Sequence, residues 1–341
     1  MRREVNALRR AHAARWAALS FLLSVGVAIG AEPQEWLERM NHALSTRNYI
    51  GVFTHNHGGR VETLRIIHRV RGRDVSERLL SLDGPGREFI REGEELTCYF
   101  PDKRTVLVER SSPDGPLLGA LPAIDAGDSN VYEIRGGERE RLLGRTTRLV
   151  ALHPRDQYRY GYRLWIDEQT SMPLKTQVCD QQGTVIEQIV FSNIDLPERI
   201  PDSMFKPQVD ASGYRWLRAE QQLASSAPSR LWEAMRLPPG FRMANRSAQA
   251  LPGSSEPVAH LVFTDGIASV SVFVEPRKAG QPAPGPARIG SSSTYSTVVD
   301  GHQVTAVGEV PPTTVEFIAK GVKAPKAATP SLGIAPQPRR P

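Results

Sequence analysis

Three histidines, His55, His57 and His68, fall within the fifteen-residue stretch THNHGGRVETLRIIH that runs from Thr54 to His68. Imidazole nitrogens are common ligands of zinc and other transition metals. A group of histidines this dense could therefore hold a metal ion, provided that the backbone brings the rings together.

The double glycine at 58–59 decides the geometry of this stretch. Two glycines flanked by alternating residues are typical of a two-residue hairpin turn, which needs positive φ. In that register His57 faces Arg60, and His68 lies about 20 Å along the strand from His55, at ~3.3 Å per residue. One ion cannot reach both, and His55 and His57 have no third ligand nearby. The stretch is interpreted as a solvent-exposed hairpin tip without a metal.

Other patterns that carry catalysis are missing from the sequence. It contains no G-x-S-x-G elbow, no phosphate-binding loop, no H-E-x-x-H and no C-x-x-C. The carboxylates between Asp83 and Glu95, Glu88 among them, lie beside turn residues and are interpreted as turn and strand-surface charges. These observations predict a protein that is not an enzyme and binds no cofactor.

The N-terminus predicts export. Five arginines within the first fifteen residues precede an uncharged run from Trp16 to Ile29, which has the length of a signal-peptide core and is short for a membrane span. Cleavage is expected near Gly30 or Ala31. An uncleaved anchor is disfavoured because the run is short. We expect residues 1–31 to be a signal peptide and the mature protein to reside in the periplasm.

The basic charge of the chain lies mostly outside its predicted folded body. The net charge is +6, but residues 1–31 carry five arginines against Glu4, a net +4. Five more cations follow from Lys320 to the end. The remaining body is slightly acidic, so the isoelectric point of about 9.5 does not indicate nucleic-acid binding.

Two cysteines in an oxidising compartment raise the question of a disulfide. Cys98 alternates with Leu96 and Phe100, whereas Cys179 alternates with Lys175 and Gln177. If both segments are strands, Cys98 faces a core and Cys179 a polar side. The alternation leaves the pairing open.

A helix followed by many strands is expected up to about residue 210. Residues 34–46 place apolar side chains on one stripe, as an amphipathic helix does. Short alternating runs broken by turn residues then predict one large antiparallel sheet. The predicted strands are Tyr49–His57, Arg60–Val70, Ser76–Leu82, Arg87–Glu92, Glu95–Phe100, Arg104–Arg110, Val131–Ile134, Arg139–Leu152, Arg159–Ile166, Leu174–Cys179 and Thr184–Phe191. A short helical insertion is expected at Pro116–Ala126.

A smaller unit is expected from 231 to 323, after a linker at 211–230. Its pattern predicts four strands and then a helix starting at Pro312. The predicted strands are Val258–Thr264, Ala268–Glu275, Thr294–Val299 and Gln303–Glu309. The loop Pro276–Ser293 is too rich in proline, glycine and serine to be expected to pack, and 324–341 is expected to be a disordered tail.

Several stretches together resemble the MucB/RseB family of periplasmic regulators of the extracytoplasmic stress sigma factor. They include RNYIGVF, ETLRIIHRV, PRDQYRYGYRLWIDEQTSMPLKT, HLVFTDGIASVSVFVEP and DGHQVTAVGEVPPTTVEFIAKGV. The resemblance runs from about Trp36 to Val322. It implies an α+β protein: a large curved antiparallel sheet over helices, a half-barrel like those of LolA and LolB, in residues 32–210, and a smaller α/β C-terminal domain.

The resemblance also implies a function. Members of the family bind the periplasmic part of a transmembrane anti-sigma factor of the MucA/RseA type and shield it from site-1 proteolysis. Lipid or lipopolysaccharide fragments promote release of the complex. A homodimer is a further expectation.

Candidate contact residues follow from the predicted strand faces and from the family-like run near the C-terminus. The lipid-facing or core candidates are Phe53, Leu64, Ile66, Phe89, Tyr99 and Trp165, and the partner-binding candidates are Gly301, His302, Gln303 and Glu309. Two other functions compete with the regulator, namely a periplasmic lipoprotein or lipid carrier and a periplasmic hydrolase. A carrier built on the large sheet alone has no need of the C-terminal unit, and a hydrolase lacks a nucleophile and base.

Overall fold

The computed structural model describes residues 32–110, 131–218, 232–249, 258–278 and 283–324. All of them belong to one compact unit that begins at Glu32. The expected signal peptide, the expected helical insertion at Pro116–Ala126 and the expected tail, apart from Ala324, lie outside these residues. Within the described ranges no helix is both long and apolar enough to cross a membrane.

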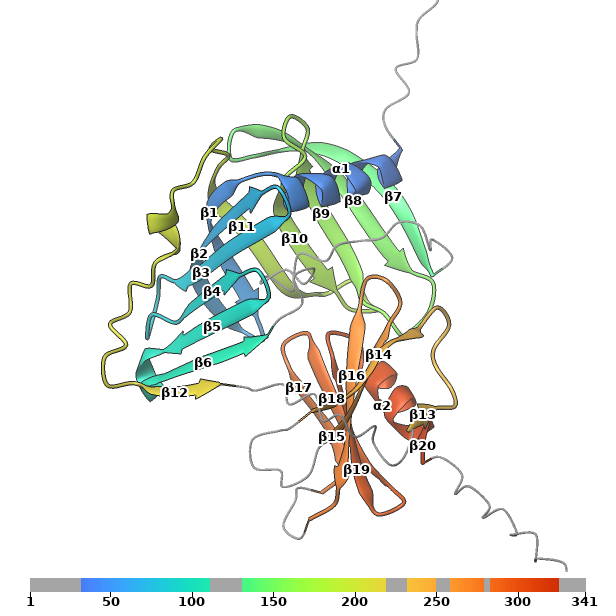
Figure 1. Cartoon of the computed structure of the whole chain (residues 1–341). Coiled ribbons are helices and arrows are strands. Elements are labelled where there is room, and N and C mark those ends of the chain that lie inside the picture. The colour runs from blue at the N-terminus through green and yellow to red at the C-terminus, as the bar shows by residue number, and fades with distance from the viewer. Residues whose placement is uncertain (1–31, 111–130, 219–231, 250–257, 279–282, 325–341) are drawn as a thin grey trace, which may run out of the picture. The chain divides into compact units, whose positions relative to one another are not determined.

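The helix expected at residues 34–46 is α1 (Pro33–Thr46), and it packs across one end of the large sheet (Figure 1). Pro33 occupies its first turn, where a missing backbone N–H costs nothing. Trp36, Leu37, Met40 and Ala43 form its buried stripe, which confirms the predicted amphipathic pattern.

The large sheet is curved and has twelve strands in the order β12-β6-β5-β4-β3-β2-β1-β11-β10-β9-β8-β7 (Figure 1). Neighbouring strands are antiparallel, except that β12 pairs with β6 in parallel. The strands are β1 (Tyr49–His57), β2 (Arg60–Arg71), β3 (Asp74–Ser81), β4 (Glu88–Glu92), β5 (Glu95–Phe100), β6 (Thr105–Arg110), β7 (Tyr132–Leu142), β8 (Arg145–Pro154), β9 (Gly161–Asp167), β10 (Pro173–Cys179), β11 (Val185–Asp195) and β12 (Arg215–Arg218). Short 3-10 turns lie at η1 (Pro101–Lys103) and η3 (Asp202–Phe205).

The predicted hairpin is present in the predicted register. Gly58 and Gly59 have φ values of 55° and 79°, His57 pairs with Arg60, and Tyr49 pairs with His68. One other turn was missed. Residues 139–152 were expected to be a single strand, but Leu143 and Gly144 at φ 52° and 73° turn the chain between β7 and β8. Leucine is not a residue type that indicates a turn, because it seldom adopts positive φ. One continuous strand was therefore predicted across this position.

Different segments of the chain cover the two faces of the large sheet. On the first, here called the helix-side face, Phe53, Leu64, Ile66 and Leu79 pack in one core with Ala43 of α1. On the second, here called the arm-side face, buried side chains pack under the segment that joins β11 to β12. This segment, residues 196–214, is called the outer arm. Figure 1 shows it in yellow as it runs past β2 and β3.

The outer arm is held by apolar contacts at two places. Ile200 and Phe205 pack on Ile67, and farther along Val209 and Tyr214 pack on a cluster formed by Ile90, Tyr99, Val106 and Val108. The chain then enters β12, so residues 215–218 of the expected linker form a strand of the large sheet.

The second sheet has six antiparallel strands in the order β14-β15-β16-β19-β18-β17, with α2 (Pro312–Gly321) packed on it. The strands are β14 (Arg242–Gln249), β15 (Val258–Thr264), β16 (Ser269–Pro276), β17 (Gly285–Ile289), β18 (Ser292–Val299) and β19 (His302–Gly308), and β13 (Glu233–Ala234) pairs with β20 (Val322–Lys323). Its core includes Phe263, Val270, Val304 and Ile318.

Two strands of the six-stranded sheet, β14 and β17, were not expected, and neither were the short strands β13 and β20. β17 lies within Pro276–Ser293, so the prediction that this loop does not pack is wrong for residues 285–289. Its proline can sit there because β17 is an edge strand. β14 has an exposed first half, and exposed strands lack the alternating apolar pattern that makes a strand recognisable.

Candidate functional site

The six residues expected to face lipid or core do not form one surface. Phe53, Leu64 and Ile66 are buried together on the helix-side face, and Phe89 packs against them from β4. Phe53 also contacts Phe191 with ring centroids 5.4 Å apart. These four therefore belong to one core.

Tyr99 and Trp165 lie on the opposite face. Tyr99 pairs with Val106 and packs in the cluster under the outer arm. Trp165 pairs with Lys175, whose ammonium lies 4.1 Å from the ring centroid. Side chains alternate along a strand, so one misjudged register moves a residue to the other face.

The four partner-binding candidates occupy opposite ends of β19. Gly301 turns the chain at φ 77°. His302 donates from Nδ1 to the backbone carbonyl of Asp300, and its ring centroid lies 5.0 Å from that of Trp232. Gln303 follows on the strand. Glu309 lies beyond the other end, about 20 Å away at ~3.3 Å per residue. The four do not form a single site.

The structure leaves Cys98 and Cys179 unpaired and buried. They lie on β5 and β10, with five other strands between them in the sheet. A disulfide needs Cα atoms within ~7 Å, and neighbouring strands alone are ~4.8 Å apart. Cys179 was expected on a polar side. It is buried because nearly all of β10 is covered on both faces.

A buried arginine joins the two sheets. Arg159, in the loop between β8 and β9, has no exposed side-chain surface and donates from Nε to Asp265 across 2.6 Å. It also donates to Asp156 and to the backbone carbonyl of Pro239, and its guanidinium lies over the ring of Phe241. A buried charge with every side of its guanidinium engaged fixes the geometry around it.

The same loop contacts α2. Thr313 and Thr314 donate to the carbonyls of Gln157 and Tyr158 at 3.1 and 2.8 Å. The ring of Tyr158 meets Phe317 edge to face. The Arg159 contact is thus one part of a broader interface between the loop and the second sheet.

The hairpin tip is not simply exposed, contrary to the sequence interpretation. A Cβ added at Gly290, in the turn between β17 and β18, would lie 3.5 Å from Nδ1 of His57. His55 is half-buried and bonds Glu187 on β11 at 2.7 Å, and the rings of His55 and His57 stack. No group of three metal-ligating side chains occurs within the described ranges.

The charge of Glu187 is stabilised at this contact. Burial opposes its ionisation, but hydrogen bonds from His55 and Ser291, together with the charges of His55 and His57, lower its pKa. Glu309 also interacts electrostatically with Glu187. Desolvation and the charge of Glu187 raise the pKa of Glu309, and the charge of His55 opposes this shift.

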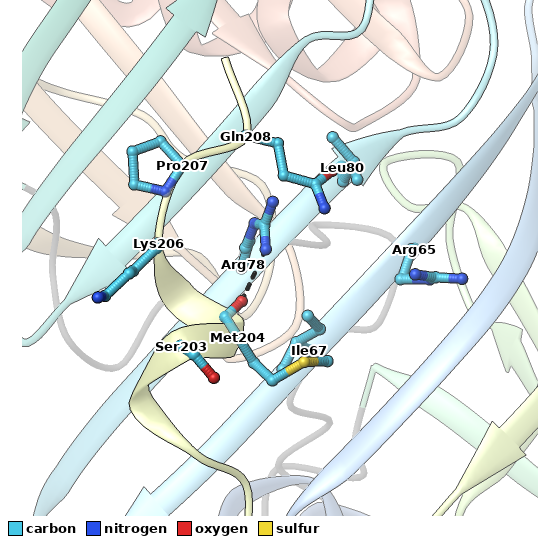
Figure 2. A pocket seen from close by; sticks show the side chains of 9 residues that line it. All are labelled: Arg65, Ile67, Arg78, Leu80, Ser203, Met204, Lys206, Pro207 and Gln208. Carbon is cyan, nitrogen blue, oxygen red and sulfur yellow. Dashed lines mark hydrogen bonds between the residues drawn. The ribbon is translucent and has the colours of Figure 1, made fainter. Parts of the chain in front are cut away.

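A pocket of about 310 Å³ lies between the outer arm and the arm-side face of β2 and β3 (Figure 2). Its strand residues are cross-strand neighbours, since Arg65 pairs with Leu80 and Ile67 with Arg78. Its lining residues are Arg65, Ile67, Arg78, Leu80, Ser203, Met204, Lys206, Pro207 and Gln208. The lining holds three cations and no carboxylate.

Buried charged side chains of the large sheet bind the outer arm beside this pocket. Arg78 donates from Nη1 to the carbonyl of Met204 at 2.8 Å and from Nε to Glu88. Glu88, which the sequence interpretation placed on the surface, is fully buried and accepts from the backbone N–H of Gln208 at 3.0 Å. Arg69 holds Asp202 at 2.6 Å. No sequence pattern indicates the contacts to the arm, because their partners lie more than a hundred residues apart.

Two family models match the chain. The model of the MucB/RseB N-terminal domain matches residues 32–209, and that of the MucB/RseB C-terminal domain matches residues 226–323. Two relatives share this span. The sigma factor AlgU regulatory protein MucB of Pseudomonas aeruginosa is 28% identical over 316 residues, 91% of this chain and 96% of that protein. The sigma-E factor regulatory protein RseB of Escherichia coli K12 is 27% identical over 311 residues, 89% and 94% of the two chains.

Solved structures give the same result. The complex of Pseudomonas aeruginosa MucA and MucB contains a chain that superposes with a TM-score of 0.67 at 27% identity, covering 87% of this chain and 100% of that one. A crystal structure of MucB has a TM-score of 0.62 at 27% identity and covers 85% and 97%. These similarities extend over both sheets.

Proposed function

Because the chain belongs to the MucB/RseB family, we propose that it is a periplasmic negative regulator of an envelope-stress sigma factor. In this role it binds the periplasmic part of a transmembrane anti-sigma factor. Binding shields that protein from the first proteolytic cut, so that the sigma factor stays sequestered.

The observation that carries the proposal is the extent of the match to a complex. The chain covers all of a MucB chain solved together with MucA, at a TM-score of 0.67. A match that spans both sheets supports a partner surface that needs both. It also disfavours the competing role of a lipid carrier, which would need the large sheet alone.

Within this proposal the Arg159 contact positions the two sheets for the partner. Arg159 and Asp265 are both buried, and the β8–β9 loop also bonds α2 through Thr313 and Thr314. A partner that touches both sheets binds more tightly when their geometry is set beforehand, since less conformational freedom is lost on binding. The role is one of binding, and no residue is assigned to catalysis.

We further propose that lipid or lipopolysaccharide fragments promote release of the partner. The apolar core of the helix-side face, which includes Phe53, Leu64 and Ile66, is the surface that an acyl chain would enter. An amphiphile weakens the complex only if it binds better to an arrangement that the partner disfavours. Entry of a chain between α1 and the sheet would produce such an arrangement.

The experiment is a reconstitution with the mature protein, residues 32–341, and the periplasmic part of the anti-sigma factor from the same organism. We expect a stable complex by size-exclusion chromatography with light scattering, which also reports whether the protein is a dimer. Addition of the site-1 protease should leave the bound partner intact and cut the free partner. A lack of binding, or binding without protection, would contradict the proposal.

A further inference from the structure

The pocket under the outer arm has the composition of an anion site. Of its lining residues Arg65, Arg78 and Lys206 are cationic, and none is acidic. Arg78 is balanced by the buried carboxylate of Glu88. Arg65 and Lys206 form no ion pair with any residue in the described part of the chain. The pocket therefore keeps an excess of positive charge.

Arg78 also keeps a free donor. Its Nε and Nη1 are bonded, but Nη2 is buried and has no hydrogen-bond partner among the described residues. The side chain is 5% exposed. A buried donor without an acceptor is unfavourable, and a guanidinium binds oxyanions with two parallel bonds when its geometry allows. An oxyanion that reaches Nη2 would remove this cost.

The remaining lining is apolar. Ile67, Leu80, Met204 and Pro207 contribute side chains beside the cations. Figure 2 shows Arg78 at the centre of the pocket, with Arg65 and Lys206 on opposite sides of it and Met204 next to Ile67. Arg65 and Lys206 are exposed and extend outward, so both can turn toward a ligand. A volume near 310 Å³ is at the lower end of the range for small-molecule sites.

We propose that this pocket binds an organic oxyanion, a phosphate monoester or carboxylate attached to a short apolar group. Arg78, Arg65 and Lys206 face the charge, and Met204, Ile67 and Leu80 contact the apolar part. Arg78 and Met204 tie the arm to β3, so a bound anion lies at the junction between them. The site is separate from the helix-side face and does not depend on the proposed partner.

The probes are hexyl phosphate below its micelle concentration, inorganic phosphate and hexyl glucoside, each titrated calorimetrically into the mature protein at low salt. Hexyl phosphate should bind, inorganic phosphate should bind more weakly and hexyl glucoside should not bind. Equal binding of the two phosphates would indicate a site for a free anion and overturn the apolar part of the proposal. Binding of hexyl glucoside alone would overturn the charged part, and no binding of either phosphate would overturn the proposal.

Variants test the residues. The double variant Arg65→Gln/Lys206→Gln should weaken hexyl phosphate binding about tenfold or more, since it removes two charge-assisted contacts. The control Arg47→Gln/Arg73→Gln removes two exposed cations outside the pocket and should leave binding unchanged. Met204→Ala should weaken hexyl phosphate more than inorganic phosphate. All variants keep the Arg78–Glu88 pair, and unchanged thermal unfolding checks that they fold. Equal losses in the double variant and its control would overturn the assignment.

Discussion

Nε of Arg159 lies 2.6 Å from the carboxylate of Asp265, and neither side chain has exposed surface. The two residues are 106 positions apart and belong to loops of different sheets. Asp265 further accepts from the backbone N–H groups of Ile267 and Ala268. The pair is thus built into the turn between β15 and β16 on one side and the β8–β9 loop on the other.

Arg159→Met should lower the free energy of unfolding by about 3–5 kcal/mol, because it leaves the charge of Asp265 buried and unpaired. Urea unfolding of the mature protein measures the change. In the double variant Arg159→Met/Asp265→Leu the loss should be smaller than the sum of the single losses. Arg135→Met, which breaks an exposed pair with Glu133, is the control and should have little effect. Additive losses would contradict coupling between Arg159 and Asp265.

His55→Ala should destabilise the protein, although the sequence alone indicated a solvent-exposed hairpin tip. The change removes a hydrogen bond to the buried Glu187, a loss of about 1 kcal/mol. His57→Ala is the matched comparison and should have the smaller effect, because His57 contacts Glu187 through its charge only. Urea unfolding at pH 7 measures both, and equal effects would contradict the assignment.

The effect of His55→Ala should depend on pH. The folded-state pKa of Glu187 is below its ordinary value, so its contribution to stability is complete above the ordinary glutamate pKa. The contribution is lost as the pH falls through the lowered value. The difference between the native protein and His55→Ala should therefore be largest near neutral pH and shrink in acid. Unfolding curves between pH 7 and 3 measure this difference in the free energy of unfolding. A difference that grows in acid would contradict the prediction.

Deletion of residues 231–341 should abolish tight binding of the anti-sigma factor. The remaining large sheet keeps its helix-side core and its outer arm, so we expect it to stay soluble. Deletion of residues 325–341 alone is the control, because it retains α2 and β20, and it should preserve binding. Calorimetric titration measures the affinities. Full affinity in the larger deletion would favour a carrier role for the large sheet.

The cysteines should react slowly with a thiol reagent in the folded protein. Burial raises the pKa of Cys98 to about 12 and also raises that of Cys179, so little thiolate is present near neutral pH. In denaturant both should react at once and give two thiols per chain. A count of zero in denaturant would reveal a disulfide and contradict the structure.

The sequence predicted local features far better than distant ones. The register from Tyr49–His68 to His57–Arg60 follows from two glycines, whose conformational freedom is visible in the sequence. The turn at Leu143 was missed because leucine seldom adopts its backbone conformation. The face of Cys179 was misjudged because polar residues beside it are themselves buried.

The pocket and the Arg159 contact could not be predicted at all. Glu88 was interpreted as a surface charge, since burial of a charge depends on a partner that one segment does not reveal. The second wall of the pocket, formed by Ser203, Met204, Lys206, Pro207 and Gln208, comes from a stretch with no periodic pattern. The positions of residues in an irregular segment are determined by tertiary contacts, so no periodic spacing of apolar residues marks them in the sequence.

If the contacts of Arg159, Thr313 and Thr314 between the sheets break, the short parallel strand β12 limits how far the second sheet can move from the first. It is the last element of the large sheet before the chain continues toward β13, and all four of its residues are exposed. Few buried contacts oppose its detachment from β6. Four extended residues span roughly 14 Å, so peeling β12 away would lengthen the tether between the sheets by about that distance. Detachment of β12 from β6 would thus lengthen the connection in a single step, without unfolding the rest of either sheet.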